Sequence, residues 1–531
     1  MKIVLIGASL RPLSVIFLME QLHACFQMTQ ALGSHNMQQS EFAFNAVDIR
    51  QALIDLPLVS AKEDLEPPLP SEIYIPSLHN KALLQEVSIV EGMRGAGKSF
   101  WTAVLLNDDT RKLVSDVTNI QKLDQLIVKI GFGMSLDNDA FPTANRLESL
   151  MQKGCTADDL WRSVLLRHLL NVLQKTTPFD NDVDAAALWV RDNRDTADNH
   201  LTTCDRALVQ QGKVFLLLFD SLDKLARDWT HIRVLLSSAL QLGLECRTRR
   251  AIRFKFFLRS DMVEEDDEIW RFADSSKLLH SKETLTWRPN DLFGLILLHL
   301  ANSESVGLAF RQEISDKTHA AFQEISGTYS LPRGLTAKEQ PLRSIVEALA
   351  GPWVGTNAKR GFTFTWIPTH LSDAKGRLSP RSILLAFSKA AQWTKDRHPD
   401  HPSALHYEGI QQGVVEASKI RISEIKEDYP WVGPLLDALG GATVPLTMNE
   451  LTVRWTDSCI DASLKAAEQN QRLPPRRYSS DPHRKGDLQA LVDDLIELAV
   501  LYRTEDKRLN MPDIFRIGFG IKRQGGVKPA R

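Results

Sequence analysis

Residues 92–99 read Gly92-Met93-Arg94-Gly95-Ala96-Gly97-Lys98-Ser99, follow an apolar run at 87–90 and precede a helix-prone segment at 100–106. Closely spaced glycines let successive backbone N–H groups turn toward one point, and the N-terminus of the following helix adds a partial positive charge there. The spacing GxxxxGK[ST] between a strand and a helix is a phosphate-binding pattern. These residues therefore predict an α/β fold with a parallel sheet, built around a nucleotide site of the P-loop type.

The expected ligands of this loop are ATP and Mg²⁺. Lys98 is expected to reach the β- and γ-phosphates, and the Ser99 hydroxyl to take one coordination position on a phosphate-bound Mg²⁺. The residues predicted to bind ATP are Gly92, Met93, Arg94, Gly95, Ala96, Gly97, Lys98, Ser99 and Phe100.

Two further apolar runs have the composition of parallel strands that are buried on both faces. The first, at 213–219, leads directly into Asp220, and the second, Ile252 to Leu258, leads into Arg259. Ligands of open α/β sheets bind at the carboxyl ends of the strands. We therefore expect Asp220 and Arg259 to lie beside the phosphates.

Phosphoryl transfer needs a metal ligand, a charge stabiliser and a group that orients water, besides the phosphate cradle. Asp220 is expected to share Mg²⁺ with Ser99. Asp223 is predicted either to orient the attacking water or to begin a helix. Arg259 is predicted either to sense the γ-phosphate or to pair with Asp223.

A lid helix is predicted to begin with Ser379 as N-cap and Pro380 as first residue. Arg381 then lies in the first helical turn, where a cation opposes the helix dipole. This placement indicates another purpose, and we expect Arg381 to reach the phosphates. The predicted catalytic set is Lys98, Asp220, Asp223, Arg259 and Arg381.

The length of 531 residues predicts several domains. A proline-rich connector at 66–70 ends a region without strong motifs, and an apolar stretch from Leu292 to Leu300 predicts a buried helix that begins near Asn290. The expected organisation is an N-terminal region of unclear role at 1–75, a P-loop domain at 76–284, a helical lid domain at 285–425 and a winged-helix-like domain at 426–531.

The C-terminal region is predicted to hold three helices and a hairpin, which together suggest a winged helix. The helices are expected at 434–439, after the capping box Thr447–Glu450, and at 487–499, with the hairpin at 500–511. Residues 472–531 contain 13 Lys and Arg against 8 Asp and Glu. The residues predicted to contact duplex DNA are Arg476, Arg477, Lys522 and Lys528; a solvated basic face is the alternative.

Composition limits the remaining possibilities. The formal net charge is −2, which argues against a globally basic nucleic-acid binder. Five scattered cysteines without CxxC or Cys/His spacing predict reduced thiols, and no apolar stretch is long enough for a membrane span. We expect a cytoplasmic protein without a membrane partner.

The motifs together resemble the STAND and AAA+ branches of P-loop ATPases. The segment FLLLFDSLDKL at 215–225 is similar to the strand and metal-binding aspartate of NACHT-like STAND proteins and Orc/Cdc6-type initiators, and FKFFLRSD at 254–261 looks like their sensor strand. LSPRSILLAF at 378–387 is similar to the initiator sensor helix or the STAND lid motif. The resemblance covers about residues 75–531 and implies a lid and a winged helix after the sheet.

One position departs from the AAA+ pattern. Many members carry a glutamate directly after the metal-binding aspartate, and Ser221 occupies that position here. The resemblance then implies a slow Mg²⁺-dependent ATPase switch that controls a protein partner or its own oligomer, in bacterial defence or DNA transactions. A DNA-binding initiator-like loader and a small-molecule kinase are the alternatives.

Overall fold

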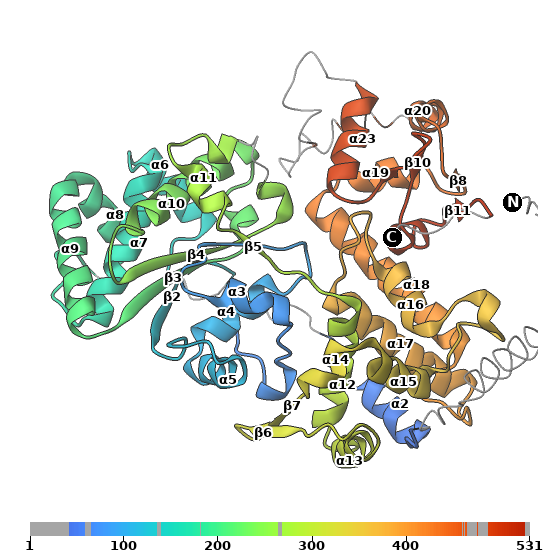
Figure 1. Ribbon diagram of the computed structural model, residues 1–531. Helices are drawn as coiled ribbons and strands as arrows, with labels where there is room; N and C mark the ends of the chain where they lie inside the picture. The colour runs from blue at the N-terminus through green and yellow to red at the C-terminus, as the bar shows by residue number, and fades with distance from the viewer. Residues whose placement is uncertain are drawn as a thin grey trace, which may run out of the picture. The chain divides into compact units, whose positions relative to one another are not determined.

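The computed structural model describes residues 42–58, 65–134, 140–180, 182–263, 268–458 and 487–525 and the single positions 460, 462, 464 and 475. A five-stranded sheet organises residues 89–284, with all its strands parallel (Figure 1). The strands are β1 (Ile89–Glu91), β2 (Leu126–Phe132), β3 (Val214–Phe219), β4 (Ile252–Leu258) and β5 (Glu283–Thr284), in the order β2-β3-β4-β1-β5. The predicted α/β class with a parallel sheet is confirmed.

Strand β3 is buried on both faces, as its composition predicts. Phe215, Leu217 and Phe219 pack into one apolar cluster, whereas Leu216 and Leu218 pack into the cluster on the opposite face. The first cluster includes residues of α7 (Ala157–Val172) and α10 (Trp229–Cys246), and the second includes residues of α4 (Lys98–Leu106) and α5 (Asp108–Thr118). The sheet is therefore a middle layer between two helical layers.

The connection from β2 to β3 is a block of helices that sequence patterns did not predict. It consists of α6 (Ala144–Gln152), α7, α8 (Val183–Asp192) and α9 (Arg194–Gln210). The connection from β4 to β5 carries the short helix α11 (Ser275–Leu279), and the chain then enters the helical region.

Residues 289–428 are mostly helical, as predicted. The elements are α12 (Pro289–Asn302), α13 (Gly307–Thr318), the hairpin β6 (Gln323–Ile325) and β7 (Thr328–Ser330), α14 (Arg333–Ala337), α15 (Glu339–Ala350), α16 (Thr363–Leu371), α17 (Pro380–Arg397) and α18 (Tyr407–Asp428). Helix α12 confirms the buried helix predicted near Asn290. Helices α17 and α18 pack along each other at the centre of this region.

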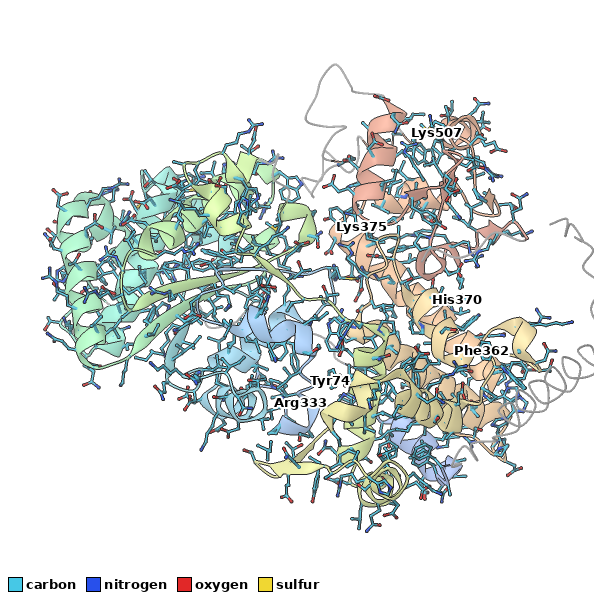
Figure 2. The ribbon with its side chains drawn as sticks, viewed as in Figure 1. Tyr74, Arg333, Phe362, His370, Lys375 and Lys507 are labelled. Atoms are coloured by element: carbon cyan, nitrogen blue, oxygen red, sulfur yellow. The ribbon has the colours of Figure 1, made fainter. Side chains whose placement is uncertain are left out.

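Residues of the N-terminal region also join this helical block. Helix α2 (Ala46–Ile54) packs on α17, where the Ser388 hydroxyl donates to the carbonyl of Ile54 at 3.1 Å. The Tyr74 hydroxyl, labelled in Figure 2, donates to Asp291 Oδ1 at 3.2 Å and so ties the segment before the P-loop to α12.

The C-terminal region contains short strands between helices. Its elements are α19 (Val432–Asp437), β8 (Thr443–Val444), α20 (Met448–Asp457), α23 (Leu488–Glu497), β9 (Tyr502–Arg503), β10 (Leu509–Asn510), α24 (Asp513–Arg516) and β11 (Lys522–Arg523). Strands β9 and β10 form the predicted antiparallel hairpin, and the predicted capping box of Thr447 and Glu450 begins α20. His370 of α16, labelled in Figure 2, lies 3.2 Å from Asp513 Oδ2 and links α16 to this region.

Candidate functional site

The loop 92–97 joins β1 to α4 at the carboxyl end of the sheet. Gly95 and Gly97 have φ values of +78° and +102°, in the left-handed region that favours glycine. The Ala96 N–H donates to the Met93 carbonyl at 3.2 Å, and α4 begins as the Trp101 N–H donates to the Gly97 carbonyl at 2.9 Å. The first N–H groups of a helix have no intrahelical acceptor, so this end of α4 is suited to an anion.

Several residues predicted to bind ATP have side chains that pack in the hydrophobic core. Met93 is 8% exposed and Ala96 is fully buried, and both belong to the apolar cluster that includes α4 and α5. Phe100 packs against this cluster. In addition, Trp287 Nε1 donates to the Ala96 carbonyl at 2.9 Å. The side chains of Met93 and Ala96 thus fix the loop from its buried side.

Lys98 folds back over the loop. Its Nζ donates to the carbonyls of Gly92 at 2.8 Å and Met93 at 3.0 Å. An ammonium group has three N–H donors, so one remains for a phosphate oxygen. Burial lowers the pKa of Lys98 to about 8, although the charge of Asp220 opposes this shift. A bound polyphosphate would oppose the effect of burial and favour the cationic form further.

Asp220 lies at the end of β3, where its N–H donates to the Phe132 carbonyl at 2.9 Å. The side chain is 1% exposed, and its Oδ2 atom has no hydrogen-bond partner among the described residues. Burial raises the pKa of Asp220, whereas a hydrogen bond from Ser99 and the charge of Lys98 lower it. A buried carboxylate oxygen without a partner is costly, which makes a cation favourable here.

The donor set fits Mg²⁺. Ser99 and Asp220 offer a hydroxyl and a carboxylate oxygen, the hard donors that Mg²⁺ prefers, and Lys98 stands beside them to receive phosphate. Mg²⁺ usually keeps several waters and phosphate oxygens in its shell, so two protein ligands are enough. Ser99 and Asp220 are the residues that would hold it.

Asp223 and Arg259 are brought together. Arg259 Nη1 lies 3.2 Å from Asp223 Oδ2, which confirms the predicted pairing of these two residues. Ser221, between the two aspartates, has a φ of 55°, and the turn after it forms a short 3₁₀ helix at Leu222–Lys224. A residue other than glycine is uncommon in the left-handed region. Ser221, which stands where many AAA+ members have a glutamate, therefore also has an unusual backbone conformation.

Arg259 is also bound by the C-terminal end of α18 and the residue after it. Its Nη1 lies 3.5 Å from Asp428 Oδ2, and its Nη2 donates to the Tyr429 hydroxyl. Asp261 pairs with Nε at 3.2 Å. Burial would lower the pKa of Arg259, but the charges of Asp261, Asp223 and Asp428 raise it well above its ordinary value. The guanidinium is therefore fully engaged by protein groups.

Arg94, a variable position of the P-loop, points toward α18 as well. Its guanidinium pairs with Asp428, lies 3.0 Å from Glu427 Oε2 and donates to the Glu424 carbonyl at 3.1 Å. Arg421 of α18 in turn donates to the Arg94 carbonyl at 3.2 Å. We call Arg94, Arg259, Glu427, Asp428 and Tyr429 the α18 latch.

The beginning of α17 contacts the P-loop. Ser379 occupies the predicted N-cap position and Pro380 the first helical position, but no side-chain cap forms. The Ser379 hydroxyl instead donates to the Gly95 carbonyl at 3.2 Å. Arg381 Nη1 lies 2.5 Å from Glu424 Oε1, so this predicted phosphate ligand is paired with α18 in the structure.

Sequence reasoning missed the α18 end of the site. Glu427 and Asp428 lie in the last turn of a helix, and Glu424 is close to it, where negative charge opposes the helix dipole. An unfavourable position relative to the helix dipole is also the reason for expecting a functional role of Arg381. The acidic residues at the end of α18 are therefore the feature of the sequence from which this part of the site could have been predicted.

The four residues predicted to contact DNA do not form a described cluster. Arg476, Arg477 and Lys528 lie outside the described residues. Lys522 is exposed on β11, and its neighbour Arg523 pairs with Asp513.

Comparisons with known proteins give no family assignment. No family model matches the chain, and a search of curated proteins finds no match. Among solved structures, the chain is similar to the ORC2 protein of Aeropyrum pernix in its ADPNP-ADP complexes, with 14% identity, 84% of this chain and 90% of that chain covered, and a TM-score of 0.37. The ADP form of that protein gives 14% identity, coverage of 80% and 83%, and a TM-score of 0.26.

Across the described ranges, every helix is too short or too polar to span a bilayer.

Proposed function

We propose that this protein binds ATP with Mg²⁺ and acts as a slow ATPase switch, in which the bound nucleotide controls the position of α18 and the C-terminal region. The observation that carries this proposal is the α18 latch. Carboxylates of α18 neutralise Arg94 of the P-loop and Arg259 at the end of β4, both beside the place expected for the phosphates.

Electrostatic competition explains how ATP would act on the latch. Asp428 pairs with both arginines, and the side chains of Asp428 and Arg259 are 17% and 11% exposed, so their charges are weakly screened. ATP brings several negative charges to the same edge of the sheet. Because Arg259 cannot satisfy a γ-phosphate and Asp428 with the same N–H groups, ATP binding favours a state in which α18 has moved away.

Hydrolysis returns the protein to the latched state. Water attacks the γ-phosphorus, the bond to the bridging oxygen of ADP breaks, and ADP, inorganic phosphate and a proton are released. Lys98 holds the phosphates, and Asp223, in the turn after β3, orients the water once Arg259 turns from it toward the nucleotide. Hydrolysis is slow because the Asp223 carboxylate must first lose its ion pair with Arg259. Ser221, at the position where many AAA+ members have a glutamate, also favours slow hydrolysis.

The C-terminal region is the proposed output of the switch. Its order of helix, strand, helix, helix and hairpin supports a winged helix at 426–531, since Leu446 next to β8 also exchanges hydrogen bonds with Leu509 of β10 at 2.8 and 2.7 Å. We propose a protein partner or a second copy of the chain as its ligand. We also propose the domain limits 76–284 for the P-loop domain and 285–425 for the lid.

Hydrogen exchange of the full chain tests the switch. ATP with Mg²⁺ should increase exchange in residues 418–428 of the wild-type protein. Asp428→Asn should show this increase without nucleotide, because it removes the charge that pairs with Arg94 and Arg259. Glu416→Gln is the matched control, since Glu416 lies on the same helix but pairs with Lys419 at 2.7 Å. Unchanged exchange in the wild type on ATP binding, or equal exchange in both variants, would contradict the proposal.

Duplex DNA is a second candidate ligand, favoured by the exposed Lys522 on β11, the strand that pairs with β8. Fluorescence anisotropy with the full chain should then show affinity that falls linearly with the logarithm of salt concentration. Replacement of Arg476, Arg477, Lys522 and Lys528 should flatten this slope. No binding at low salt would leave the protein partner as the output.

A further inference from the structure

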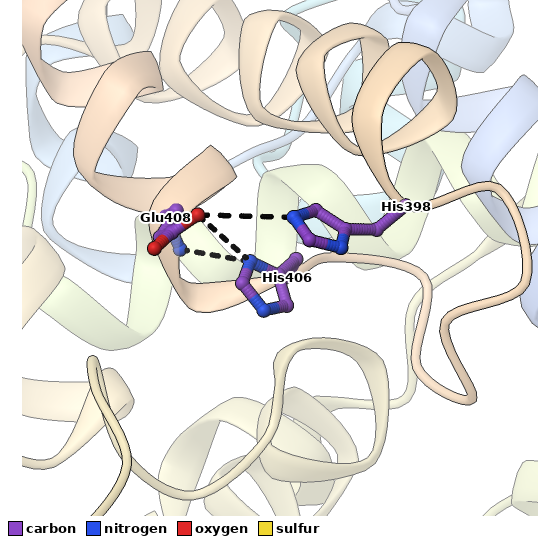
Figure 3. A group of neighbouring side chains, drawn as sticks. All are labelled: His398, His406 and Glu408. Carbon is purple, nitrogen blue, oxygen red and sulfur yellow. Dashed lines mark hydrogen bonds and ion pairs between the residues drawn. The ribbon is translucent and has the colours of Figure 1, made fainter.

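A second group of ligating side chains lies in the loop between α17 and α18 and in the first turn of α18. The sequence of this segment, His398-Pro399-Asp400-His401-Pro402-Ser403-Ala404-Leu405-His406-Tyr407-Glu408, contains three histidines and a glutamate in eleven residues. Figure 3 shows His398, His406 and Glu408, with both imidazole rings directed toward the carboxylate. None of these residues takes part in the nucleotide site.

The ligand atoms of these three residues are close enough to share one ion. They all lie within 4.8 Å of one another, with Glu408 Oε2 3.7 Å from His398 Nε2 and 3.9 Å from His406 Nδ1. Tetrahedral Zn²⁺ with bonds of about 2.0–2.1 Å needs ligand atoms roughly 3.4 Å apart. The side chains of His398 and Glu408 are 41% and 47% exposed, so they have the freedom to close the remaining distance.

The loop itself is held rigidly. Arg50 of α2, only 2% exposed, donates to the carbonyls of Pro399 at 2.6 Å, His401 at 3.1 Å, Ser403 at 3.1 Å and Ala404 at 2.9 Å. A buried arginine with four carbonyl acceptors fixes the path of the chain between the histidines. Preorganisation of this kind lowers the cost of assembling a metal site.

The second end of the segment is fixed as well. The His406 N–H donates to Thr394 Oγ1 at 3.0 Å, and the Leu405 N–H donates to the Leu349 carbonyl at 3.0 Å. His406 Nδ1 accepts the Glu408 N–H at 3.3 Å. An ion on Nδ1 would replace this long hydrogen bond, and water can serve the freed N–H at the start of α18, where helical N–H groups lack intrahelical acceptors.

We propose that His398, His406 and Glu408 form a binding site for a divalent transition-metal ion of the Zn²⁺ class. Imidazole and carboxylate donors suit Zn²⁺, whereas the oxygen donors of Ser99 and Asp220 suit Mg²⁺. Three protein ligands leave a fourth position for water.

Metal titration of the chelator-treated full chain tests this site. Calorimetry with Zn²⁺ should show one equivalent bound, and Co²⁺ should give the visible absorption bands of a tetrahedral complex. His398→Ala and Glu408→Gln should each weaken Zn²⁺ binding at least tenfold. A thermal melt of each variant without metal confirms that it is folded.

His231→Ala is the matched control. His231 is also exposed and lies 2.7 Å from a carboxylate, that of Asp228, but it has no second histidine in a described metal-ligating group. This variant should bind Zn²⁺ like the wild type. Excess Mg²⁺ should not displace Zn²⁺, and Lys98→Ala should leave the stoichiometry unchanged, so the result is separable from the nucleotide proposal. Absence of the Co²⁺ bands, or wild-type affinity in folded His398→Ala, would overturn the inference.

Discussion

Arg259 and Asp223 form an ion pair, with Nη1 of the arginine 3.2 Å from Oδ2 of the aspartate. The pair connects the end of β4 with the turn after β3. It also links the two roles expected of these residues, because Arg259 cannot turn toward a γ-phosphate without releasing Asp223. Release would free the Asp223 carboxylate for a water molecule at the moment when ATP is bound.

Asp223→Asn should slow ATP hydrolysis by roughly 10–100-fold while ATP affinity changes less than threefold, as expected for a group that assists proton transfer or orients water. Single-turnover hydrolysis and calorimetry are the measurements. Asp261→Asn is the control, because Asp261 also pairs with Arg259 at 3.2 Å. Equal hydrolysis rates in the two variants would reduce Asp223 to a charge partner of Arg259.

Lys98→Ala should lower ATP affinity by roughly 10–100-fold, because a hydrogen bond to a charged group contributes about 1.5–3 kcal/mol. The variant also removes the hydrogen bonds from Lys98 to the Gly92 and Met93 carbonyls, but the apolar side chains of the loop stay packed, so the protein should remain folded. Calorimetry with a nonhydrolysable ATP analogue checks the affinity, and circular dichroism checks the fold. Wild-type affinity in the folded variant would remove Lys98 from the site.

ATP binding should depend on pH near the pKa of Lys98, which burial lowers to about 8. Bound phosphate favours the charged ammonium and raises this pKa, so binding takes up a proton above about pH 8 and affinity falls as pH rises further. Calorimetry in buffers of different ionisation enthalpy measures the proton uptake. Lys98→Arg stays cationic and should therefore show no proton uptake on ATP binding. Proton uptake equal to that of the wild type would mean that a group other than Lys98 takes up the proton.

Asp220→Ala should weaken the Mg²⁺ dependence of ATP binding. The variant removes a buried carboxylate whose Oδ2 lacks a partner among the described residues, so the fold should lose little stability without ligand. ATP affinity measured with and without Mg²⁺ should differ less in the variant than in the wild type. Asp220→Asn tests the charge alone, and an unaltered Mg²⁺ effect in both variants would exclude Asp220 as a metal ligand.

Gly95→Ala should reduce both stability and ATP affinity. A Cβ atom at this position would lie 2.6 Å from Ser379 Oγ, at a φ of +78°. Gly154→Ala is the control, because its φ is +86° but no atom lies within 4 Å of the new Cβ. Both variants share a backbone cost of about 1–2 kcal/mol. A larger loss of thermal stability in Gly95→Ala, measured by calorimetry, would report the contact between the P-loop and α17; equal losses would contradict its importance.

Local patterns in the sequence were sufficient for β1, β3, β4 and the phosphate loop, whereas β2 and β5 of the same sheet were not predicted. The runs before Asp220 and Arg259 formed β3 and β4, because only an apolar strand is stable between two helical layers. Lys255, inside the second run, is fully buried in β4 and donates to the carbonyls of Ala82, Leu84 and Val87 at 2.7–2.9 Å. These acceptors are more than 160 residues away in sequence, so no local pattern identifies them.

The direction of the site arginines was not predictable for the same reason. Arg94 and Arg381 both pair with residues near the end of α18: Glu427 lies 333 residues after Arg94, and Glu424 lies 43 residues after Arg381. A motif specifies the backbone conformation of its own loop, whereas the partner of a long side chain depends on which distant helix end packs beside it. The helices α6–α9 were not predicted from the sequence. Their apolar residues pack into a core that several elements share, and such packing is not visible in a local pattern.

Helix α18 carries one candidate site at each end. Its first turn holds Glu408 beside the two histidines, its last turn holds Glu427 and Asp428 of the latch, and its 22 residues extend about 33 Å. A continuous helix of this length behaves as a lever, and a tilt of about 10° about one end moves the other by roughly 6 Å, from the same rise per residue. A metal ion at one end and a nucleotide at the other would then both depend on the tilt of α18. Binding at either end would change the affinity at the other.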